Sequence, residues 1–230
     1  MKRLALGMAL IVSASLGFAD NNGYRPQYEV TITNLTKASQ FTPILAATHR
    51  RSISYFELGQ PASEGLETMA EAGGVSILAD ALAATGKVVD TANSADVIVP
   101  PPGVPPLLFA GQTVTLNLEG DRRGQARLSL AAMILPSNDS FVALDRVRLP
   151  RYGTRTYYAV GYDAGTEVND EYCPNIPGPF CGGSGEVSIA SEDDEGFVHV
   201  ANGIAGNGDI PAERYDWRNP IAKIVVRRVR

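Results

Sequence analysis

With 230 residues, of which 44% are hydrophobic, the chain is long enough to bury one substantial core without disulfide support. Its formal net charge is −5, which argues against a nucleic-acid partner because phosphates are bound by basic surfaces. Basic residues do gather near the C-terminus, but they are interspersed with Ile and Val over residues 221–229, which is typical of a strand with one face in water.

Residues 1–19 have the pattern of a signal peptide. Lys2 and Arg3 form a charged start, an apolar run too short to span a bilayer follows, and small residues precede a cleavage point near Ala19. The alternative is an uncleaved N-terminal anchor. We expect a secreted or periplasmic protein whose mature chain, residues 20–230, forms a single domain with no transmembrane segment.

The first elements along the mature chain are two strands and a pair of helices. Residues 28–35 are rich in β-branched side chains and alternate in polarity, which predicts a strand with one buried face, and a second strand begins near Phe41. Residues 62–84 change to Ala, Leu, Glu and Met. A cap at Ser63 and a Gly73-Gly74 break predict two short helices, packed as an insertion over one end of the sheet structure.

Beyond these helices the pattern is almost entirely β. The proline-rich residues 100–106 are interpreted as a stiff crossing inside one domain. Further strands are predicted at residues 112–118, 126–135, 141–149, 155–161, 197–201 and 221–229, with turn residues between them and long glycine-rich and acidic loops between 181 and 216. This spacing predicts a mainly β protein, an antiparallel β-sandwich with a short helical insertion near residues 62–84.

The chain has two cysteines, Cys173 and Cys181, in the exported part. The seven residues between them include three prolines and a glycine, which predicts a loop. In an oxidising compartment we expect the two to form a disulfide, the alternative being two free thiols.

Two acidic motifs that follow strand-like runs predict a cation site. Asp139 lies in the first, and Asp163 and Glu167 lie in the second on either side of Gly165, which permits a sharp turn. Carboxylates brought to one end of a sandwich repel each other, and a hard divalent cation that prefers oxygen ligands relieves this repulsion. We therefore predict Ca²⁺ as the bound ion.

These motifs also carry a family resemblance. Residues 135–142 with Asp145, and residues 162–167, resemble the Pro-Ser-Pro-Asp-Trp-Phe-Val and Asp-Ala-Gly-Thr-Asp signatures of the spondin domain. That domain occurs in the matrix proteins F-spondin and mindin and in many bacterial proteins. Residues 61–73 are similar to the helical segment of the family, and the three motifs occur in the family's order.

The resemblance implies that Asp139, Asp163 and Glu167 are the metal ligands. Asp145 would support the ligands from behind them or, alternatively, pair with a neighbouring arginine. The motifs depart from the family pattern at Asn138 and Ser140, which replace Pro and Trp, and at Glu167, which replaces Asp and alters the geometry of the site.

Other polar features favour ordinary structural roles. The acidic run 192–195 lacks the ligand and glycine spacing of an EF-hand loop, so we interpret it as a solvated turn and not as a rival calcium site. His49 and His199 lie in no hydrolase or zinc-peptidase motif, and His199 is expected on the wet face of a strand. Trp217, the single tryptophan, is expected to pack at the sandwich edge.

The sequence thus predicts an exported, calcium-binding β-sandwich that is not an enzyme and acts in adhesion or recognition at the cell exterior or envelope. The resemblance implies this role. Its partner would be an extracellular or envelope protein or a glycan, which the sequence does not identify. The alternative is a secreted hydrolase that uses acidic residues on a polysaccharide or a similar substrate.

Overall fold

The computed structural model describes residues 24–183 and 192–230. The predicted signal peptide lies outside the described residues, so export and the cleavage point near Ala19 stay predictions. Within the described part of the chain, no helix combines the length and the apolar character needed to cross a membrane.

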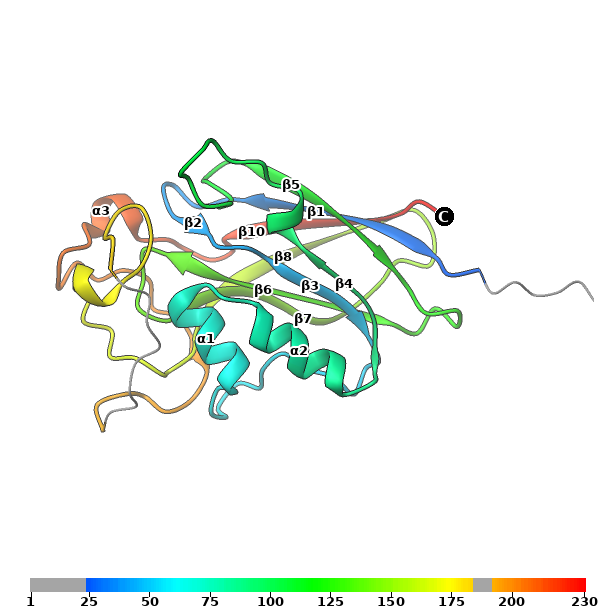
Figure 1. Cartoon of the computed structure of the whole chain (residues 1–230), viewed down its shortest axis with the longest axis horizontal. Helices are drawn as coiled ribbons and strands as arrows, with labels where there is room; N and C mark the ends of the chain where they lie inside the picture. Colours follow the sequence, from blue (N-terminus) through cyan, green and yellow to red (C-terminus); the bar gives the residue numbers. More distant parts are fainter. Residues whose placement is uncertain (1–23, 184–191) are drawn as a thin grey trace, which may run out of the picture.

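Ten strands pair into one antiparallel sheet that curls around its core (Figure 1). The order of the main path is β4-β3-β6-β7-β8-β10-β1-β5, with β2 paired to β6 and β9 paired to β8. The strands are β1 (Gln27–Asn34), β2 (Gln40–Phe41), β3 (Leu45–His49), β4 (Val88–Asn93), β5 (Thr113–Glu119), β6 (Arg127–Leu135), β7 (Ser140–Arg148), β8 (Thr154–Asp163), β9 (His199–Val200) and β10 (Ala222–Arg228).

The two outer strands of this path, β4 and β5, approach each other and nearly close the sheet. The Glu119 backbone N–H on β5 donates to Asp90 Oδ2 on β4 over 2.7 Å, and the Thr48 hydroxyl on β3 donates to the Glu119 carbonyl over 2.5 Å. The mainly β, antiparallel sandwich class predicted from the sequence is confirmed, in a form that is nearly a closed barrel.

Every second side chain of these strands points into the interior that the curled sheet encloses. In β1, Val30 and Ile32 are buried, and in β5 the residues opposite them, Leu116 and Val114, are buried in the same cluster. Trp217, 6% exposed, joins this cluster. The period-two pattern of these strands therefore reflects one face in the core and one in water.

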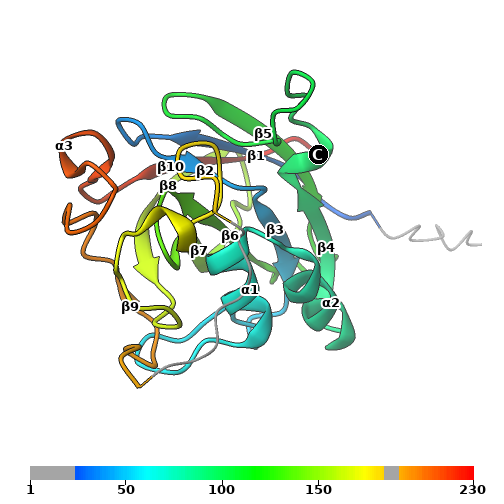
Figure 2. The same ribbon diagram turned by 60° about the vertical axis from the view of Figure 1, so that its left-hand side comes forward.

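The helices α1 (Glu64–Ala72) and α2 (Ser76–Ala84) lie along the outer face of the sheet, over β3 and β6 (Figure 1, Figure 2). The Ser63 hydroxyl caps α1 by accepting the Leu66 N–H. Leu66 and Met69 pack with Ala131 of β6 and Phe141 of β7 in a second core cluster. The expected position over one end of the sandwich is therefore wrong, because the helices cover a sheet face.

Three short helical turns complete the described elements: η1 (Ser94–Asp96), η2 (Cys173–Asn175) and α3 (Ala212–Tyr215). Cys173 and Cys181 form the predicted disulfide, which closes a loop at the start of η2. The proline-rich residues 100–106 lie between β4 and β5, two strands of the same sheet, so they are a connection inside it as predicted.

Candidate cation site at the loop end of β7 and β8

Strand pairing brings the two acidic motifs together. Strand β7 begins directly after Asp139 and β8 ends at Asp163, and Ser140 is paired with Asp163 in the ladder. Beyond the last pair, the Ala164 N–H donates to the backbone carbonyl of Asp139 over 3.2 Å. The predicted ligands Asp139 and Asp163 are therefore neighbours at one end of the sheet, although 24 positions separate them in the chain.

Asp139 is fully buried and only part of its carboxylate is satisfied. Its Oδ2 accepts the Thr166 N–H over 2.8 Å and the Glu167 N–H over 3.2 Å, so the second motif wraps around the first. Its Oδ1 is buried and has no hydrogen-bond partner among the described residues, and the same is true of Glu167 Oε2. Buried carboxylate oxygens without donors are suited to a cation.

Gly165 holds the second motif against the segment before β9. Its φ of 68° lies in the left-handed region, and a Cβ at this position would stand 2.4 Å from the Phe197 carbonyl oxygen. The Gly196 N–H also donates to the Gly165 carbonyl over 2.8 Å. Only glycine permits this close approach, which brings residues 195–199 up to Asp163.

Burial and mutual repulsion keep these acids from ionising easily. Burial, followed by the charge of Asp163, raises the pKa of Asp139 to about 8. Burial, followed by the charge of Glu71 on α1, raises the pKa of Glu167 to about 8, and burial also raises the pKa of Asp163. A cation bound among these carboxylates would reverse this balance by favouring their charged forms.

The structure adds two residues to this site that the sequence analysis did not assign to it. Ligand atoms of Asp163, Glu195 and His199 all lie within 4.8 Å of one another. Residues 192–194 do form a turn, but Glu195 behind it reaches Asp163. The His199 side chain is 22% exposed and its Nε2 faces Asp163, so it is half-buried and not on a fully wet face. Neither Glu195 nor His199 stands in a recognisable sequence motif. They reach Asp163 because Gly165 packs against Phe197, and this contact is visible only in the structure.

Asn138, one of the departures from the family motif, anchors the next loop. Its amide donates to Asp170 Oδ1 over 3.0 Å and its carbonyl accepts the Glu171 N–H over 3.1 Å. The Glu171 carboxylate in turn accepts the backbone N–H groups of residues 205–207. These bonds tie three loops together behind the acidic residues.

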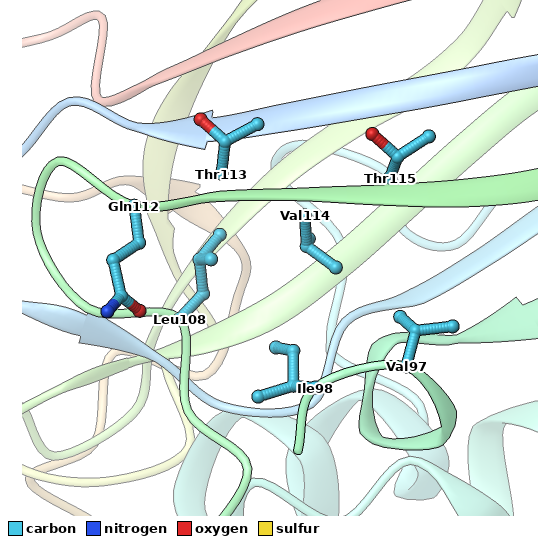
Figure 3. A pocket seen from close by; sticks show the side chains of 7 residues that line it. All are labelled: Val97, Ile98, Leu108, Gln112, Thr113, Val114 and Thr115. Carbon is cyan, nitrogen blue, oxygen red and sulfur yellow. The ribbon is translucent and has the colours of Figure 1, made fainter. Parts of the chain in front are cut away.

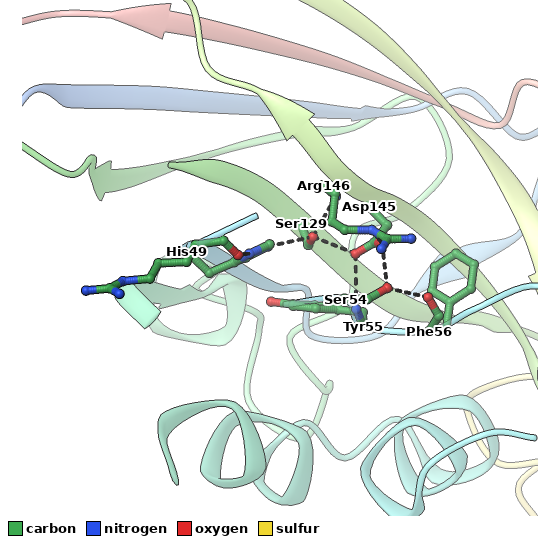
Figure 4. Close-up of polar contacts among 8 residues, drawn as sticks. His49, Ser54, Tyr55, Phe56, Ser129, Asp145 and Arg146 are labelled. Atoms are coloured by element: carbon green, nitrogen blue, oxygen red, sulfur yellow. Dashed lines mark hydrogen bonds and ion pairs between the residues drawn. The ribbon is translucent and has the colours of Figure 1, made fainter. Parts of the chain in front are cut away.

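Asp145 belongs to a different network on β7 (Figure 4). It forms an ion pair with Arg146 and accepts hydrogen bonds from Ser54, the Tyr55 backbone and Ser129. The arginine-pairing alternative for Asp145 is therefore confirmed.

The same network contains a histidine, a serine and a carboxylate but not in a catalytic order. Ser129 Oγ lies 2.8 Å from His49 Nε2 and 2.7 Å from Asp145 Oδ1, so the serine stands between the other two. In a nucleophilic triad the histidine stands in the middle and the serine is open to substrate, whereas Ser129 is fully buried. This arrangement is structural.

Two cavities lie away from the acidic residues. One of about 500 Å³ opens between Ile98 and the start of β5, lined also by Leu108 and Val114 (Figure 3). Another of about 400 Å³ lies beside Asp145 and Arg146 and includes Tyr158. Neither of these two cavities is lined by Asp139, Asp163 or Glu167.

The fold and this cluster define a β-sandwich whose loops at one end gather buried acids. The Spondin_N family model matches residues 22–176, more than half of the chain, and this range includes Asp139, Asp163 and Glu167. The chain belongs to the spondin N-terminal domain family. A comparison with curated proteins found no match.

Proposed function

We propose that this protein is an exported recognition or adhesion domain in which Ca²⁺ organises the loops at the end of β7 and β8. Family membership supports the extracellular role, and the disulfide fits an oxidising compartment. The observation that carries the proposal for calcium is the fully buried Asp139, whose Oδ1 has no donor although Asp163 lies beside it.

The donor set fits calcium in its chemistry. Asp139, Asp163 and Glu167 supply carboxylate oxygens from an irregular loop, and calcium accepts six to eight oxygen ligands in flexible geometry. When bound, the ion would supply positive charge that holds these acids together. The chain's own residues hold Asp139 through the backbone N–H groups of residues 166 and 167.

Organised loops give this domain its means of recognition. Residues 163–170 and 192–198 meet at the acids, and residues 205–207 are tied to Glu171 behind them. Binding residues in sandwiches are commonly carried by such loops. The proposed partner is an extracellular or envelope protein or a glycan. No observation favours the hydrolase alternative, since domains of this family are in general not enzymes and the buried Ser129 lacks a catalytic arrangement.

Calcium titration of the metal-free protein tests this proposal. Free Ca²⁺ at a hundred times its dissociation constant should add about 2.7 kcal/mol to the free energy of unfolding and raise the melting temperature. Magnesium should do less, because it demands a strict octahedron. Binding of the protein to isolated cell envelopes should then weaken in chelator. One melting temperature with and without millimolar calcium would contradict the metal assignment.

A further inference from the structure

His199 presents a nitrogen to the acidic cluster. Its Nδ1 lies 3.1 Å from the Val200 carbonyl oxygen, and because a carbonyl only accepts, Nδ1 carries the proton. The other nitrogen, Nε2, lies 3.4 Å from Asp163 Oδ1 and has no hydrogen-bond partner among the described residues. Nε2 is therefore turned toward the carboxylate of Asp163, the position in which a histidine nitrogen and a carboxylate oxygen can bind one cation together.

The side chains of His199, Asp163 and Glu195 are held by hydrogen bonds of the kind that usually orient metal ligands. A ligating histidine commonly donates its second ring N–H to a backbone carbonyl, as His199 does to Val200. The Asn169 amide nitrogen lies 3.0 Å from Asp163 Oδ2 and 3.2 Å from Glu195 Oε1, so it holds both carboxylates. The Gly165 N–H donates to Asp163 Oδ1 over 2.9 Å.

Asp139 lies on the interior side of the cluster. It is fully buried, and the charges of Asp163 and Glu195 both raise its pKa, so positive charge in the cluster would also relieve repulsion at Asp139. On the other side Glu195 is exposed and His199 half-buried, which leaves a path for an ion from solvent.

We infer that Asp163, Glu195 and His199 form a binding site for a divalent transition-metal ion of the Zn²⁺ class, distinct from the calcium position at Asp139 and Glu167. One imidazole and two carboxylates suit Zn²⁺, whereas calcium prefers an all-oxygen set. Tetrahedral zinc-to-ligand bonds of about 2.0–2.2 Å place ligand atoms roughly 3.3–3.6 Å apart. The ligand atoms here lie within 4.8 Å of one another, so side-chain rotations can close the site.

Asp163 is shared, and its carboxylate would bridge the two positions. Three protein ligands leave a coordination position for water or for a group of the bound partner. Glu195 and His199 lie beyond residue 176, where the family match ends. The inference does not depend on calcium binding.

Calorimetry with tag-free, chelator-treated protein tests the site. Zn²⁺ should bind at one ion per chain, and Co²⁺ should give a visible absorption band from nitrogen-containing coordination. His199→Gln and, separately, Glu195→Gln should lower zinc affinity by at least about tenfold, since even removal of residues that only orient ligands costs 10–100-fold. Glu192→Gln, an exposed acid of the same segment, is the matched control and should keep wild-type zinc affinity.

Absence of zinc binding by the wild-type protein, or a change of less than tenfold in His199→Gln, would overturn the inference and leave an ion pair between His199 and Asp163. Asp139→Asn separates the two metal positions, because it should abolish the calcium response and retain zinc binding. Loss of zinc binding in a folded Asp139→Asn protein would show a single shared site and overturn the second one. A failed calcium response with intact zinc binding would contradict only the proposed function.

Discussion

Asp139 and Asp163 are held side by side by the backbone of the strands that carry them, since Ala164 donates to the carbonyl of Asp139 and Ser140 pairs with Asp163. The two carboxyl groups cannot separate without opening the end of the β7–β8 ladder. Their repulsion is therefore built into the folded state, and it must be relieved by protons or by a cation.

The metal-free protein should lose stability as pH rises. Asp139 and Glu167 have pKa values of about 8 when folded, against ordinary values of 3.8 and 4.5, so the folded state binds protons more tightly than the unfolded chain. Their contribution to the free energy of unfolding is therefore full near pH 4 and is lost as pH rises through 8. Thermal melts in chelator between pH 5.5 and 8.5 measure this decline.

Calcium should act in the opposite direction, because it binds the deprotonated acids. The rise in melting temperature caused by calcium is expected to be larger at pH 8.5 than at pH 5.5. Asp139→Asn should flatten the decline seen in chelator. An equal decline in wild type and in this variant would mean that other groups cause it.

Asp163→Asn should remove the calcium response without weakening the metal-free fold. The amide oxygen can still accept the Gly165 N–H, and the loss of one repelling charge beside Asp139 offsets the loss of the bond from Asn169. Melting temperatures in chelator and in calcium measure both effects. Glu192→Gln should respond to calcium like wild type, and loss of the response in Glu192→Gln instead would place the site elsewhere.

Gly165→Ala should destabilise the protein and weaken cation binding. The added Cβ meets the Phe197 carbonyl, and a left-handed alanine costs about 1–2 kcal/mol by itself. Gly124→Ala is the matched control, because Gly124 has a φ of 63° with no atom within 4 Å of the added Cβ. If urea denaturation shows equal losses for both variants, the contact with Phe197 contributes nothing.

Removal of the disulfide should cost stability without changing the fold. The loop closed by Cys173 and Cys181 is short, and chain entropy predicts a loss of about 2–3 kcal/mol in a Cys173→Ser, Cys181→Ser double variant. Denaturation with and without reductant measures it. Reductant should lower the stability of wild type only, and an effect of equal size on the double variant would refute the explanation.

Export predicts a mature protein that starts near Asp20. N-terminal sequencing or intact mass of the native protein checks the cleavage point after Ala19. A product that still begins at Met1 and sediments with membranes would support the anchor alternative instead.

Strands with one solvent-exposed face, such as β1 and β5, were predictable because apolar and polar residues alternate along them. The helix pair was also predictable, since two short helices separated at Gly73-Gly74 were expected within residues 62–84, and α2 occupies Ser76–Ala84. The position of the helix pair on a face of the sheet was not predictable from the helices themselves, because it is encoded in the strand that they cover. β6 is buried on both faces over Leu128–Leu135, where one face meets the core and the other meets α1.

The short strands β3 and β4 were not predicted. All five residues of β3 are buried, so its sequence has no alternation to read, and β4 is half-buried almost throughout. The site shows the same limit. Its acidic motifs are local in sequence and were found, whereas Glu195 and His199 join it only through the contact of Gly165 with Phe197, a tertiary relationship without a sequence pattern.

The bonds from Asp90 and Thr48 to the Glu119 backbone bear on how copies of this protein behave at high concentration. An outer strand with free N–H and C=O groups is a template on which another chain can add a strand and start an aggregate. At Glu119 both backbone groups are already occupied by side chains of β4, the opposite edge strand, and of its neighbour β3. Loss of Asp90 or Thr48 should therefore appear first as self-association, before any effect on the proposed cation site at the end of β7 and β8.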